Sequence, residues 1–385
     1  MKTIKQVDFK GKKVFIRVDF NVPVKDGKVS DNTRILAHLQ TINFILNQSP
    51  KAVILASHLG RPKGERKPEL SLKVVVGEVE NALNRKVIFL DDCIGEEIKK
   101  KIENSNGDVF LLENLRFHKG EEKNDENFAR ELSSLADVFV QDAFAVVHRA
   151  HASTVGITKL LPSYAGFLIE KEVQYLSNLL ENPQRPFVAV LGGAKVSTKI
   201  SVIENLLKKV DKLLIGGAMS YTILKAKGIQ IGSSLYEEGF VEKAKEFLKE
   251  EKLILPCDHL VSKSLKNPVE TKTVKEIPDG FYGVDIGDET IKLYHEKIKN
   301  AKTIFWNGPL GIFEVPEFSK GTVAIAKSIA ERTSEGAVSV AGGGDSVSAI
   351  KKGGFFDKFS HISTGGGASL EFVEGKILPG IEVLK

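Results

Sequence analysis

The stretch FVAVLGGAKVSTKISVIENLLKKV, residues 187–210, decides the fold class of this chain. Its first five residues are apolar and rich in valine, which predicts a strand buried on both faces. Gly192 and Gly193 then form a turn, and the apolar spacing of 200–210 predicts an amphipathic helix. A strand that leads through glycines into a helix is the repeating unit of a parallel α/β sheet.

The same alternation of apolar run and amphipathic stretch recurs along the whole chain. In the first half the predicted strands are 12–20, 51–57, 86–90, 108–114 and 137–144. In the second half they are 187–193, 212–217, 252–258, 303–309, 337–343 and 358–366, with a further helix predicted at 241–252. We therefore expect an α/β protein with two doubly wound domains, each a mostly parallel sheet with helices on both faces.

The chain is long enough for two domains with separate cores, because it has 385 residues. The segment 161–186 is the expected boundary. Leu161-Pro162-Ser163 is expected to start a long helix that bridges the domains, and Pro183 and Pro186 to end it. This places a first domain at 1–165 and a second at 166–369.

Composition excludes several classes of protein. The net charge is only +5, and it comes from lysines that form no block of five or six, so nucleic-acid binding is disfavoured. Two cysteines, Cys93 and Cys257, make neither a disulfide framework nor a zinc site, which fits a reducing cytoplasm. The first residues lack the apolar core of a signal peptide, and no membrane-spanning run is present. We expect a cytoplasmic protein, and nothing demands more than a monomer.

Arginine and glycine are distributed unequally between the two halves. Eight of the ten arginines lie in the first 149 residues, whereas twenty-four of the 34 glycines follow residue 170. The planar guanidinium binds carboxylate and phosphate, and glycine turns before helices let backbone N–H groups approach phosphate. The first half is therefore predicted to bind a small anion and the second a nucleotide, which suggests phosphoryl transfer between them.

The anion half begins with RVDFNVP, residues 17–23. Arg17, Asp19 and Asn21 alternate with apolar residues, and because alternate side chains of a strand share a face, all three are expected on one face at a strand end. The alternative interpretation is an edge strand with one solvent-exposed face. Arg34 follows at the start of a predicted helix, which Asp31 or Asn32 is expected to cap.

Further basic residues follow other predicted strands. SHLGRP supplies His58 and Arg61, and ENLRFH and HRAH supply Arg116 and Arg149. Any one of them alone is best explained as a solvated surface residue. Together, however, clustered guanidiniums repel one another unless an anion or carboxylates neutralise them.

The nucleotide half has three motifs. In LGGAKVSTKI, Lys195 and Lys199 are spaced i, i+4, which predicts one helical face. In AGGGDS the helix is expected to open at Asp345-Ser346 and to offer its N–H groups to phosphate. Asp345 is either a Mg²⁺ ligand or a plain helix cap. The third motif is WNGPLGIFE, in which Glu314 is placed to accept hydrogen bonds from a ribose.

Several common nucleotide-binding motifs are missing. The sequence has no GxxxxGK[ST], no protein-kinase catalytic set and no dinucleotide fingerprint after its first strand. A P-loop enzyme, a protein kinase and a nucleotide-dependent dehydrogenase are therefore disfavoured.

A resemblance to a known family now becomes clear. RVDFNVP, SHLGRP, ENLRFH, HRAHASTVGI, LGGAKVSTKI, WNGPLGIFE, GGGDS and STGGGASLEF resemble phosphoglycerate kinases, and they run in the family's order from residue 17 to residue 372. The resemblance implies reversible transfer of the acyl phosphate of 1,3-bisphosphoglycerate to ADP, giving 3-phosphoglycerate and ATP, with Mg²⁺. It also implies that the tail, about 370–385, packs back on the first domain.

The resemblance assigns roles residue by residue. The positions expected to bind phosphoglycerate are Asp19, Asn21, Arg34, His58, Leu59, Gly60, Arg61, Arg116 and Arg149. Those expected to bind the nucleotide are Gly193, Lys195, Lys199, Gly283, Glu314, Gly343, Gly344, Asp345 and Ser346, with Asp345 also at the metal. Arg34, Lys195 and Gly344 are expected to be catalytic, in a direct in-line transfer that requires the two halves to close.

One departure and two alternatives accompany this assignment. The family usually has a Gly-Thr or similar pair after DAF, where this chain has Ala145-Val146, so the loop carrying Arg149 is expected to shift. The alternatives are a kinase of another small carboxylate or carbamate and a non-catalytic nucleotide-binding protein on the same fold.

Overall fold

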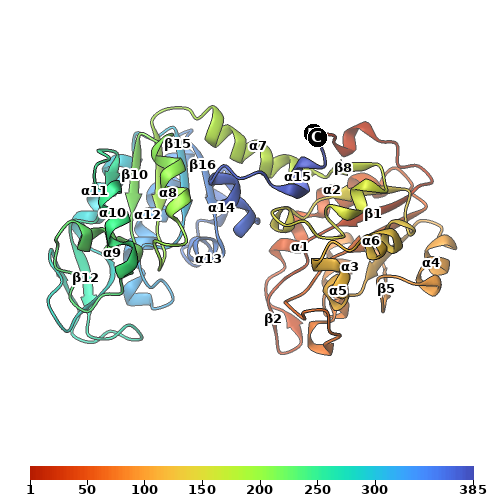
Figure 1. The fold of residues 1–385 in the computed structure, drawn as a ribbon, viewed down its shortest axis with the longest axis horizontal. Helices are drawn as coiled ribbons and strands as arrows, with labels where there is room; N and C mark the ends of the chain where they lie inside the picture. Colours follow the sequence, from red (N-terminus) through yellow and green to blue (C-terminus); the bar gives the residue numbers. More distant parts are fainter. The chain divides into compact units, whose positions relative to one another are not determined.

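The computed structural model describes residues 1–385, and they form two compact units. Unit 1 comprises Met1–Gln174 and Ile377–Lys385, and unit 2 comprises Tyr175–Lys376. The division falls inside helix α7 (Phe167–Glu181), later than the boundary placed at 165/166 from the sequence. Figure 1 labels many of the elements of both units.

Unit 1 is built on a six-stranded sheet of order β5-β6-β4-β1-β7-β8, in which every pair is parallel. The strands are β1 (Lys13–Arg17), β4 (Ala52–Ala56), β5 (Val87–Leu90), β6 (Asp108–Leu112), β7 (Val138–Gln141) and β8 (Ser163–Ala165). The first five lie inside the stretches that the sequence predicts.

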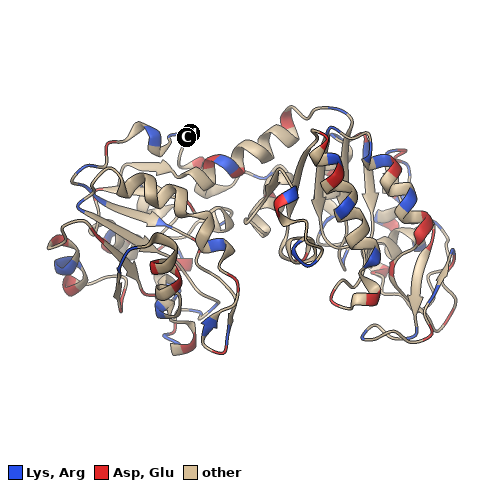
Figure 2. Ribbon diagram, turned by 180° about the vertical axis from the view of Figure 1, so that it is seen from behind, with Lys and Arg blue, Asp and Glu red and all other residues tan.

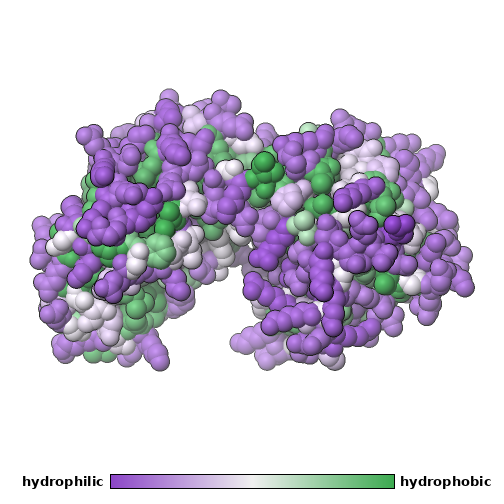
Figure 3. Space-filling model, viewed as in Figure 1, coloured by the Kyte–Doolittle hydropathy of each residue, from purple (hydrophilic) through white to green (hydrophobic).

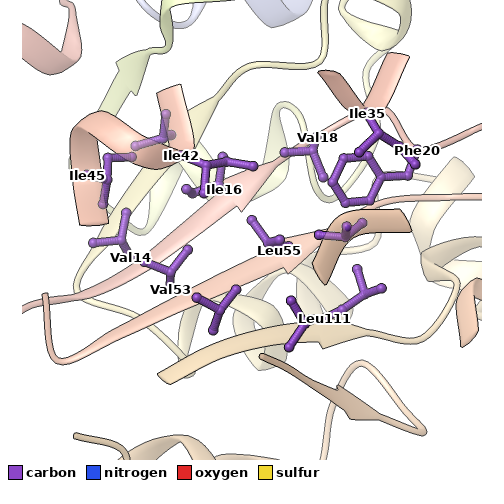
Figure 4. Packing of buried hydrophobic residues seen from close by; sticks show 14 of the residues in the cluster. Val14, Ile16, Val18, Phe20, Ile35, Ile42, Ile45, Val53, Leu55 and Leu111 are labelled. Atoms are coloured by element: carbon purple, nitrogen blue, oxygen red, sulfur yellow. The ribbon is translucent and has the colours of Figure 1, made fainter. Parts of the chain in front are cut away.

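Both faces of this sheet are covered, as its apolar strands require. Val14 and Ile16 of β1 pack with Ile42 and Ile45 on one face (Figure 4), beneath α1 (Thr33–Ala37), α2 (Leu39–Leu46) and α3 (Val76–Leu83). Phe15 points the other way, into a cluster with α4 (Glu96–Glu103) and α6 (Glu126–Ser133). The expected doubly wound arrangement is confirmed here. A short hairpin of β2 (Val24–Lys25) and β3 (Lys28–Val29) and helix α5 (Lys119–Glu122) complete this part of unit 1.

Unit 2 has a second all-parallel sheet, of order β11-β10-β9-β15-β16-β17. Its strands are β9 (Phe187–Leu191), β10 (Lys212–Ile215), β11 (Leu253–Ile254), β15 (Thr303–Asn307), β16 (Val338–Gly342) and β17 (His361–Ile362). Its helices are α8 (Ile200–Leu207), α9 (Met219–Ala226), α10 (Val241–Phe247), α11 (Asp288–Ile298), α12 (Lys320–Ser334), α13 (Gly344–Lys352) and α14 (Gly367–Val373).

Strand β9 shows why this sheet also needs two covered faces. Val188 and Val190 pack in one cluster with residues of α11, α12 and α13. Ala189 and Leu191 point to the opposite face and are equally buried. All six predicted strands of the second half are present, so the α/β fold class holds in both units.

A small antiparallel sheet in unit 2 escaped the sequence analysis. It has the order β13-β12-β14 and consists of β12 (His259–Ser262), β13 (Lys272–Val274) and β14 (Tyr282–Ile286). The sequence gives weak signals here because the strands are short and β13 is largely exposed.

The predicted start of the bridging helix is wrong. Ser163–Ala165 form the edge strand β8, which pairs with β7, and the helix α7 begins only at Phe167. The Pro162 carbonyl accepts a hydrogen bond from Phe139 N–H at 2.9 Å, which holds this segment extended along β7. Sheet pairing outweighs the helix-start signal of Leu161-Pro162-Ser163.

The C-terminal residues return to unit 1. Helix α15 (Pro379–Glu382) follows Lys376, and Gly380 N–H donates to the Val147 carbonyl at 2.8 Å. Lys2 N–H donates to the Leu384 carbonyl at 2.8 Å, so the two ends of the chain meet within this unit. This segment begins at Ile377, some residues after the start at about 370 that the resemblance suggests.

The surface is polar and its charges are mixed. Figure 2 shows Lys and Arg interspersed with Asp and Glu along the helices, and the face in Figure 3 is mostly hydrophilic, with apolar residues scattered over it. None of the helices is long and apolar enough to cross a membrane.

Candidate active site

The first group of predicted residues lies at the carboxyl edge of the sheet of unit 1. Strands β6, β4, β1 and β7 are neighbours in that sheet, and Asn114, His58, Asp19 and Asp142 follow them within two residues. Because the carboxyl ends of parallel strands share one edge, motifs far apart in the sequence meet here.

Asp19 and Arg34 form the centre of this group. The Asp19 Oδ2 atom accepts a hydrogen bond from Arg34 Nη1 at 2.6 Å, and Oδ1 accepts one from Asn21 N–H at 3.2 Å. The carboxylate is buried, whereas the Arg34 side chain is 35% exposed, so part of its guanidinium is open to a ligand. Of the two candidate caps for α1, Asp31 is the one that accepts from Thr33 N–H.

Arg17, at the end of β1, fixes the tautomer of His58. Its Nε donates to Ser153 Oγ at 2.8 Å, and its Nη2 lies 3.3 Å from His58 Nδ1. Arginine can only donate, so Nδ1 accepts and the ring proton is on Nε2. Burial, and then Arg17, Arg116 and Arg34, hold the pKa of His58 well below 6.5, so the imidazole is neutral.

The SHLGRP loop is held by two of the other predicted residues. Gly60 N–H donates to Asn21 Oδ1 at 2.9 Å, and the Gly60 carbonyl accepts from Arg116 Nη1 at 3.0 Å. Asn114 holds the buried Leu59 by donating to its carbonyl at 2.7 Å. Gly60 has φ +63°, and a Cβ there would lie 2.7 Å from Leu70.

Positive charge acts on His151 as well as on His58. Burial, and then Arg17, Arg116 and Arg149, lower the pKa of His151 to about 3. Two buried nitrogens make no hydrogen bond in the protein. They are Arg116 Nε, which lies 3.5 Å from Glu122 Oε1, and His151 Nδ1, which lies 3.9 Å from Glu121 Oε1. An arginine nitrogen without a hydrogen bond, amid several guanidiniums, suits an anionic ligand.

The remaining two arginines are less tightly held. Arg61 and Arg149 are exposed, and Arg149 Nε lies 3.2 Å from His148 Nε2. The structure therefore joins Asp19, Asn21, Arg34, His58, Gly60 and Arg116 by direct contacts or a shared field, and leaves these two at the rim.

The departure at Ala145-Val146 has no strained backbone. Both residues lie in a 3₁₀ turn (Phe144–Val146), and neither has a positive φ. Because the turn is right-handed, glycine is not needed there.

Besides Asn114, four residues of this site were not predicted, although they carry its internal bonds. Glu121 and Ser153 are fully buried, and Ser153 donates to Glu121 through both Oγ, at 2.6 Å, and N–H, at 3.0 Å. His38 and Asp142 form a second buried pair at 2.7 Å. A buried polar residue in an otherwise apolar pattern is the only signal the sequence offers for such partners.

The second group of predicted residues lies at the carboxyl edge of the sheet of unit 2. Glycines follow the neighbouring strands β10, β9, β15 and β16. Gly193 N–H donates to the Pro309 carbonyl at 2.9 Å, and Gly217 N–H donates to the Leu310 carbonyl at 2.9 Å. A Cβ on Gly192 would lie 2.0 Å from the Pro309 carbonyl oxygen, so the close approach of these two backbone segments requires glycine.

A cavity of about 260 Å³ opens beside these turns. Four predicted nucleotide-binding residues line it, namely Gly193, Gly283, Glu314 and Asp345. The other walls, to which the sequence analysis assigned no role, are largely apolar: Ala194, Gly217, Ala218, Tyr221, Leu235, Leu265, Val284, Pro309, Leu310, Gly311 and Ile312. An apolar pocket with a few polar groups at its rim suits a flat heterocyclic base attached to a polar tail.

Lys195 and Lys199 do not share a helical face, which corrects the prediction. Helix α8 begins only at Ile200, so both lysines precede it. Glu237 holds the intervening turn by accepting from Ser197 N–H at 2.9 Å and Ser197 Oγ at 2.6 Å, which outweighs helix formation. Lys195 is exposed.

Lys199 is instead buried against strand β15. Its Nζ donates to the Asn307 carbonyl at 3.2 Å and contacts Asn307 Oδ1. Burial lowers the pKa of Lys199 to about 8, and Asp345 partly opposes this shift. A phosphate brought close to a buried ammonium of lowered pKa stabilises its charged form.

Helix α13 presents its N-terminus at the same edge. Gly343 occupies the N-cap position with φ +93°, and Gly344 and Asp345, in the first turn, are exposed. Asp345 is therefore not the helix cap. Ser346 is buried, and its Oγ accepts from Gly308 N–H at 2.5 Å, so it braces the loop after β15.

Comparison with known proteins identifies the family. A family model described as phosphoglycerate kinase matches residues 4–376. The chain is 53% identical to a phosphoglycerate kinase of Thermosipho africanus, covering 98% of this chain and 96% of that one. It is 52% identical to one of Clostridium tetani, covering 100% and 97%.

Solved structures agree with this result. The structure of phosphoglycerate kinase from Coxiella burnetii superposes with a TM-score of 0.88 at 41% identity, covering 99% of this chain and 98% of that one. The corresponding values for the Pyrococcus horikoshii enzyme are 0.87 and 33%, with 100% and 98% covered. The chain therefore belongs to the phosphoglycerate kinase family.

Proposed function

We propose that this chain catalyses the reversible transfer of the acyl phosphate of 1,3-bisphosphoglycerate to ADP, with phosphoglycerate bound by unit 1 and nucleotide by unit 2. The observation that carries this proposal is the pairing, in one chain of this family, of a guanidinium cluster at one sheet edge with an apolar cavity beside glycine turns at the other. The first suits a small polyanion and the second a nucleotide.

The phosphoglycerate would bind at the carboxyl edge of the sheet of unit 1. Arg34, His58, Arg61, Arg116 and Arg149 would supply its donors, with His58 donating from Nε2. Asn21 and Gly60 shape the loop, and Asp19 orients Arg34 through their 2.6 Å hydrogen bond. Neutral imidazoles amid arginines leave the positive charge on the guanidiniums, which stay charged at all working pH values.

The nucleotide would bind in the cavity of unit 2. Its base would lie against Gly283 and the apolar wall, its ribose would donate to Glu314, and its phosphates would extend toward Gly193, Lys195, Lys199 and Gly343–Ser346. Asp345 would hold Mg²⁺, since its exposed carboxylate offers the hard oxygen that this ion prefers. The bound ion neutralises phosphate charge.

The transfer itself needs positioning rather than a nucleophilic side chain. The acceptor is a phosphate or carboxylate oxygen, which is already ionised, so no general base is required. Arg34 and Lys195 would hold the equatorial oxygens of the transferring phosphoryl group, and the Gly344 N–H would add a third donor.

Since each unit binds one substrate, transfer requires the units to approach each other when both are filled. Small-angle scattering with ADP and 3-phosphoglycerate together is expected to give a smaller radius of gyration than either alone. An unchanged radius would contradict this step.

Coupled turnover tests the proposed function. Mg-ATP and 3-phosphoglycerate are supplied, and a dehydrogenase reports the 1,3-bisphosphoglycerate through loss of NADH. We expect turnover that requires both substrates and Mg²⁺ and that falls at least a hundredfold in Arg34→Ala and Lys195→Ala, the range for loss of a transition-state donor.

Exposed lysines outside the cavity serve as matched controls, and Lys227→Ala is expected to leave turnover unchanged. Binding of ADP without turnover in the folded wild type would instead identify a non-catalytic nucleotide-binding protein. The free cysteines Cys93 and Cys257 support a reducing compartment, and a monomer remains our expectation for the active species.

A further inference from the structure

His38 is a buried polar residue with no place in the catalytic scheme above. It lies between α1 and α2 and is 1% exposed. Its Nε2 accepts a hydrogen bond from the Asp19 backbone N–H at 2.9 Å. His38 therefore holds the main chain of the residue whose carboxylate binds Arg34.

The second ring nitrogen of His38 is held equally firmly. Nδ1 lies 2.7 Å from Asp142 Oδ2, and Asp142 is fully buried. Because Nε2 accepts from a backbone N–H, the proton of the neutral ring is on Nδ1 and is donated to Asp142. The carboxylate thus fixes the tautomer that Asp19 needs.

Asp142 connects this pair to helix α7. Its Oδ1 accepts from Thr41 Oγ1 at 2.9 Å and from Leu168 N–H at 3.0 Å. Thr41 Oγ1 in turn accepts from Phe167 N–H at 2.9 Å. The first two N–H groups of α7 therefore donate to the hydrogen-bond network that holds Asp19. A buried carboxylate at a helix N-terminus is electrostatically favourable, because it faces the positive end of the helix dipole.

We propose that His38 is a positioning residue for phosphoglycerate. His38 holds the backbone of Asp19, and the Asp19 carboxylate in turn orients the guanidinium of Arg34. Through Asp142, His38 also connects the backbone at Asp19 to the first turn of α7. The inference rests on the proposed assignment of Asp19 and Arg34 to phosphoglycerate.

Packing alone does not account for an imidazole at this position. His38 has an edge contact with Phe20, at 5.9 Å between ring centroids, which an apolar ring would provide as well. An apolar ring would leave the Asp19 N–H and the Asp142 carboxylate with fewer partners in a site where water is excluded.

Two conservative variants separate the two bonds of His38. In His38→Asn the amide nitrogen takes the place of Nδ1, so the tie to Asp142 is kept and the acceptor for Asp19 is lost. In His38→Gln the amide oxygen reaches the place of Nε2, so the acceptor for Asp19 is kept and the donor to Asp142 is lost. Ile42→Val, a buried change in the neighbouring turn of α2, is the control for packing.

We expect the KM for 3-phosphoglycerate to rise about tenfold in His38→Asn, with the KM for ATP within twofold of the wild type. In His38→Gln the KM for 3-phosphoglycerate stays within about twofold, while the melting temperature falls. Ile42→Val lowers the melting temperature slightly and changes neither KM. Equal KM values in His38→Asn and His38→Gln would overturn the proposal.

A spectroscopic measurement on the wild type keeps the proposal testable even if a variant fails to fold. The ¹⁵N resonances of His38 should show a protonated Nδ1 and an unprotonated Nε2, and 3-phosphoglycerate should shift the Nε2 resonance. A protonated Nε2 would contradict the assignment. Absence of wild-type turnover would count against the proposed function instead, and would leave this tautomer result standing.

Discussion

At the residue scale, the site is governed by how burial treats each charged or titratable group. His58 and His151 are buried among arginines and stay neutral, and Lys199 is buried with only Asp345 to favour its charge. The arginines keep their charge because guanidinium is too basic to lose it. Two predictions follow from these environments, one for nucleotide binding and one for stability.

Lys199 is expected to link nucleotide binding to proton uptake. Its pKa is about 8 in the free protein, and a bound phosphate would raise it, so above pH 8 the lysine must take up a proton when ADP binds. The Kd for ADP should rise by up to about tenfold per pH unit between pH 8 and pH 9.5. Calorimetry at pH 8.5 in two buffers of different ionisation enthalpy measures the proton directly.

Lys199→Met should abolish this uptake, whereas Lys195→Met should weaken binding and leave the uptake in place. Identical heats in the two buffers for the wild type would contradict a phosphate contact of Lys199.

The two neutral histidines are expected to make the protein sensitive to acid. The pKa of His151 is about 3 in the folded protein and near 6.5 when unfolded, so between these values the unfolded state binds the extra proton. Stability is thus complete above pH 6.5 and is lost as pH falls, by about 2 kcal/mol from His151 alone at pH 5.

Urea unfolding at pH 7 and pH 5 checks this linkage. His151→Gln should lose less free energy of unfolding than the wild type between the two pH values. The same loss in both proteins would show that His151 is already charged in the native state.

At the element scale, both sites depend on where strands end and helices begin. Asp19 and His58 follow neighbouring strands of one sheet, and Gly193 and Gly343 follow β9 and β16, which flank β15 in the other. The N-termini of α7 and α13 differ in their surroundings. Buried Asp142 accepts a hydrogen bond from the first turn of α7, whereas Gly344 and Asp345 in the first turn of α13 are exposed. An exposed helix N-terminus has free N–H groups for phosphate.

Gly343 and Gly344 test this difference as a matched pair. At Gly343, φ is +93° and a Cβ would lie 2.8 Å from Asn307 Nδ2, so Gly343→Ala should destabilise the protein by roughly 1–3 kcal/mol. A Cβ added at Gly344 would have no atom within 4 Å, so Gly344→Ala should leave the free energy of unfolding unchanged or raise it by about 0.5–1 kcal/mol.

Turnover should nevertheless fall in Gly344→Ala, because the added methyl group stands where the phosphates are expected to approach. Denaturant unfolding and the coupled assay measure the two effects separately. Full turnover with an unchanged KM for ATP would exclude close approach of the phosphates at Gly344.

At the scale of the whole molecule, the chain crosses between its two units twice. It leaves unit 1 within α7 and returns after Lys376 to finish beside its own N-terminus. Leu378, Ile381 and Leu384 are buried, and they belong to unit 1 although they come at the end of the chain.

The tail is therefore expected to stabilise unit 1. Leu384 is 1% exposed, and Leu384→Ala should lower the free energy of unfolding by about 2–5 kcal/mol. Its neighbour Val383 is 38% exposed, and Val383→Ala should change it by less than about 0.5 kcal/mol. Differential scanning calorimetry compares the two, and equal melting curves would show that the tail does not contribute to the core.

The sequence alone determined the fold class and predicted most of the residues of the candidate site. Apolar runs separated by amphipathic stretches specify buried parallel strands, because only residues covered on both faces are apolar throughout. It also located the arginines and glycines, since these residue types follow strands whose carboxyl ends share an edge. The family motifs then named the expected roles.

Only the tertiary structure decided the pairings that depend on distant residues. Ser163–Ala165 form a strand because β7 offers them an edge, and the turn at Lys195 stays out of α8 because Glu237 binds it. The tie from His38 to Asp19 and Asp142 joins residues up to 123 positions apart, from Asp19 to Asp142. No local pattern encodes such a bond, because its energy arises only when folding removes water from both partners.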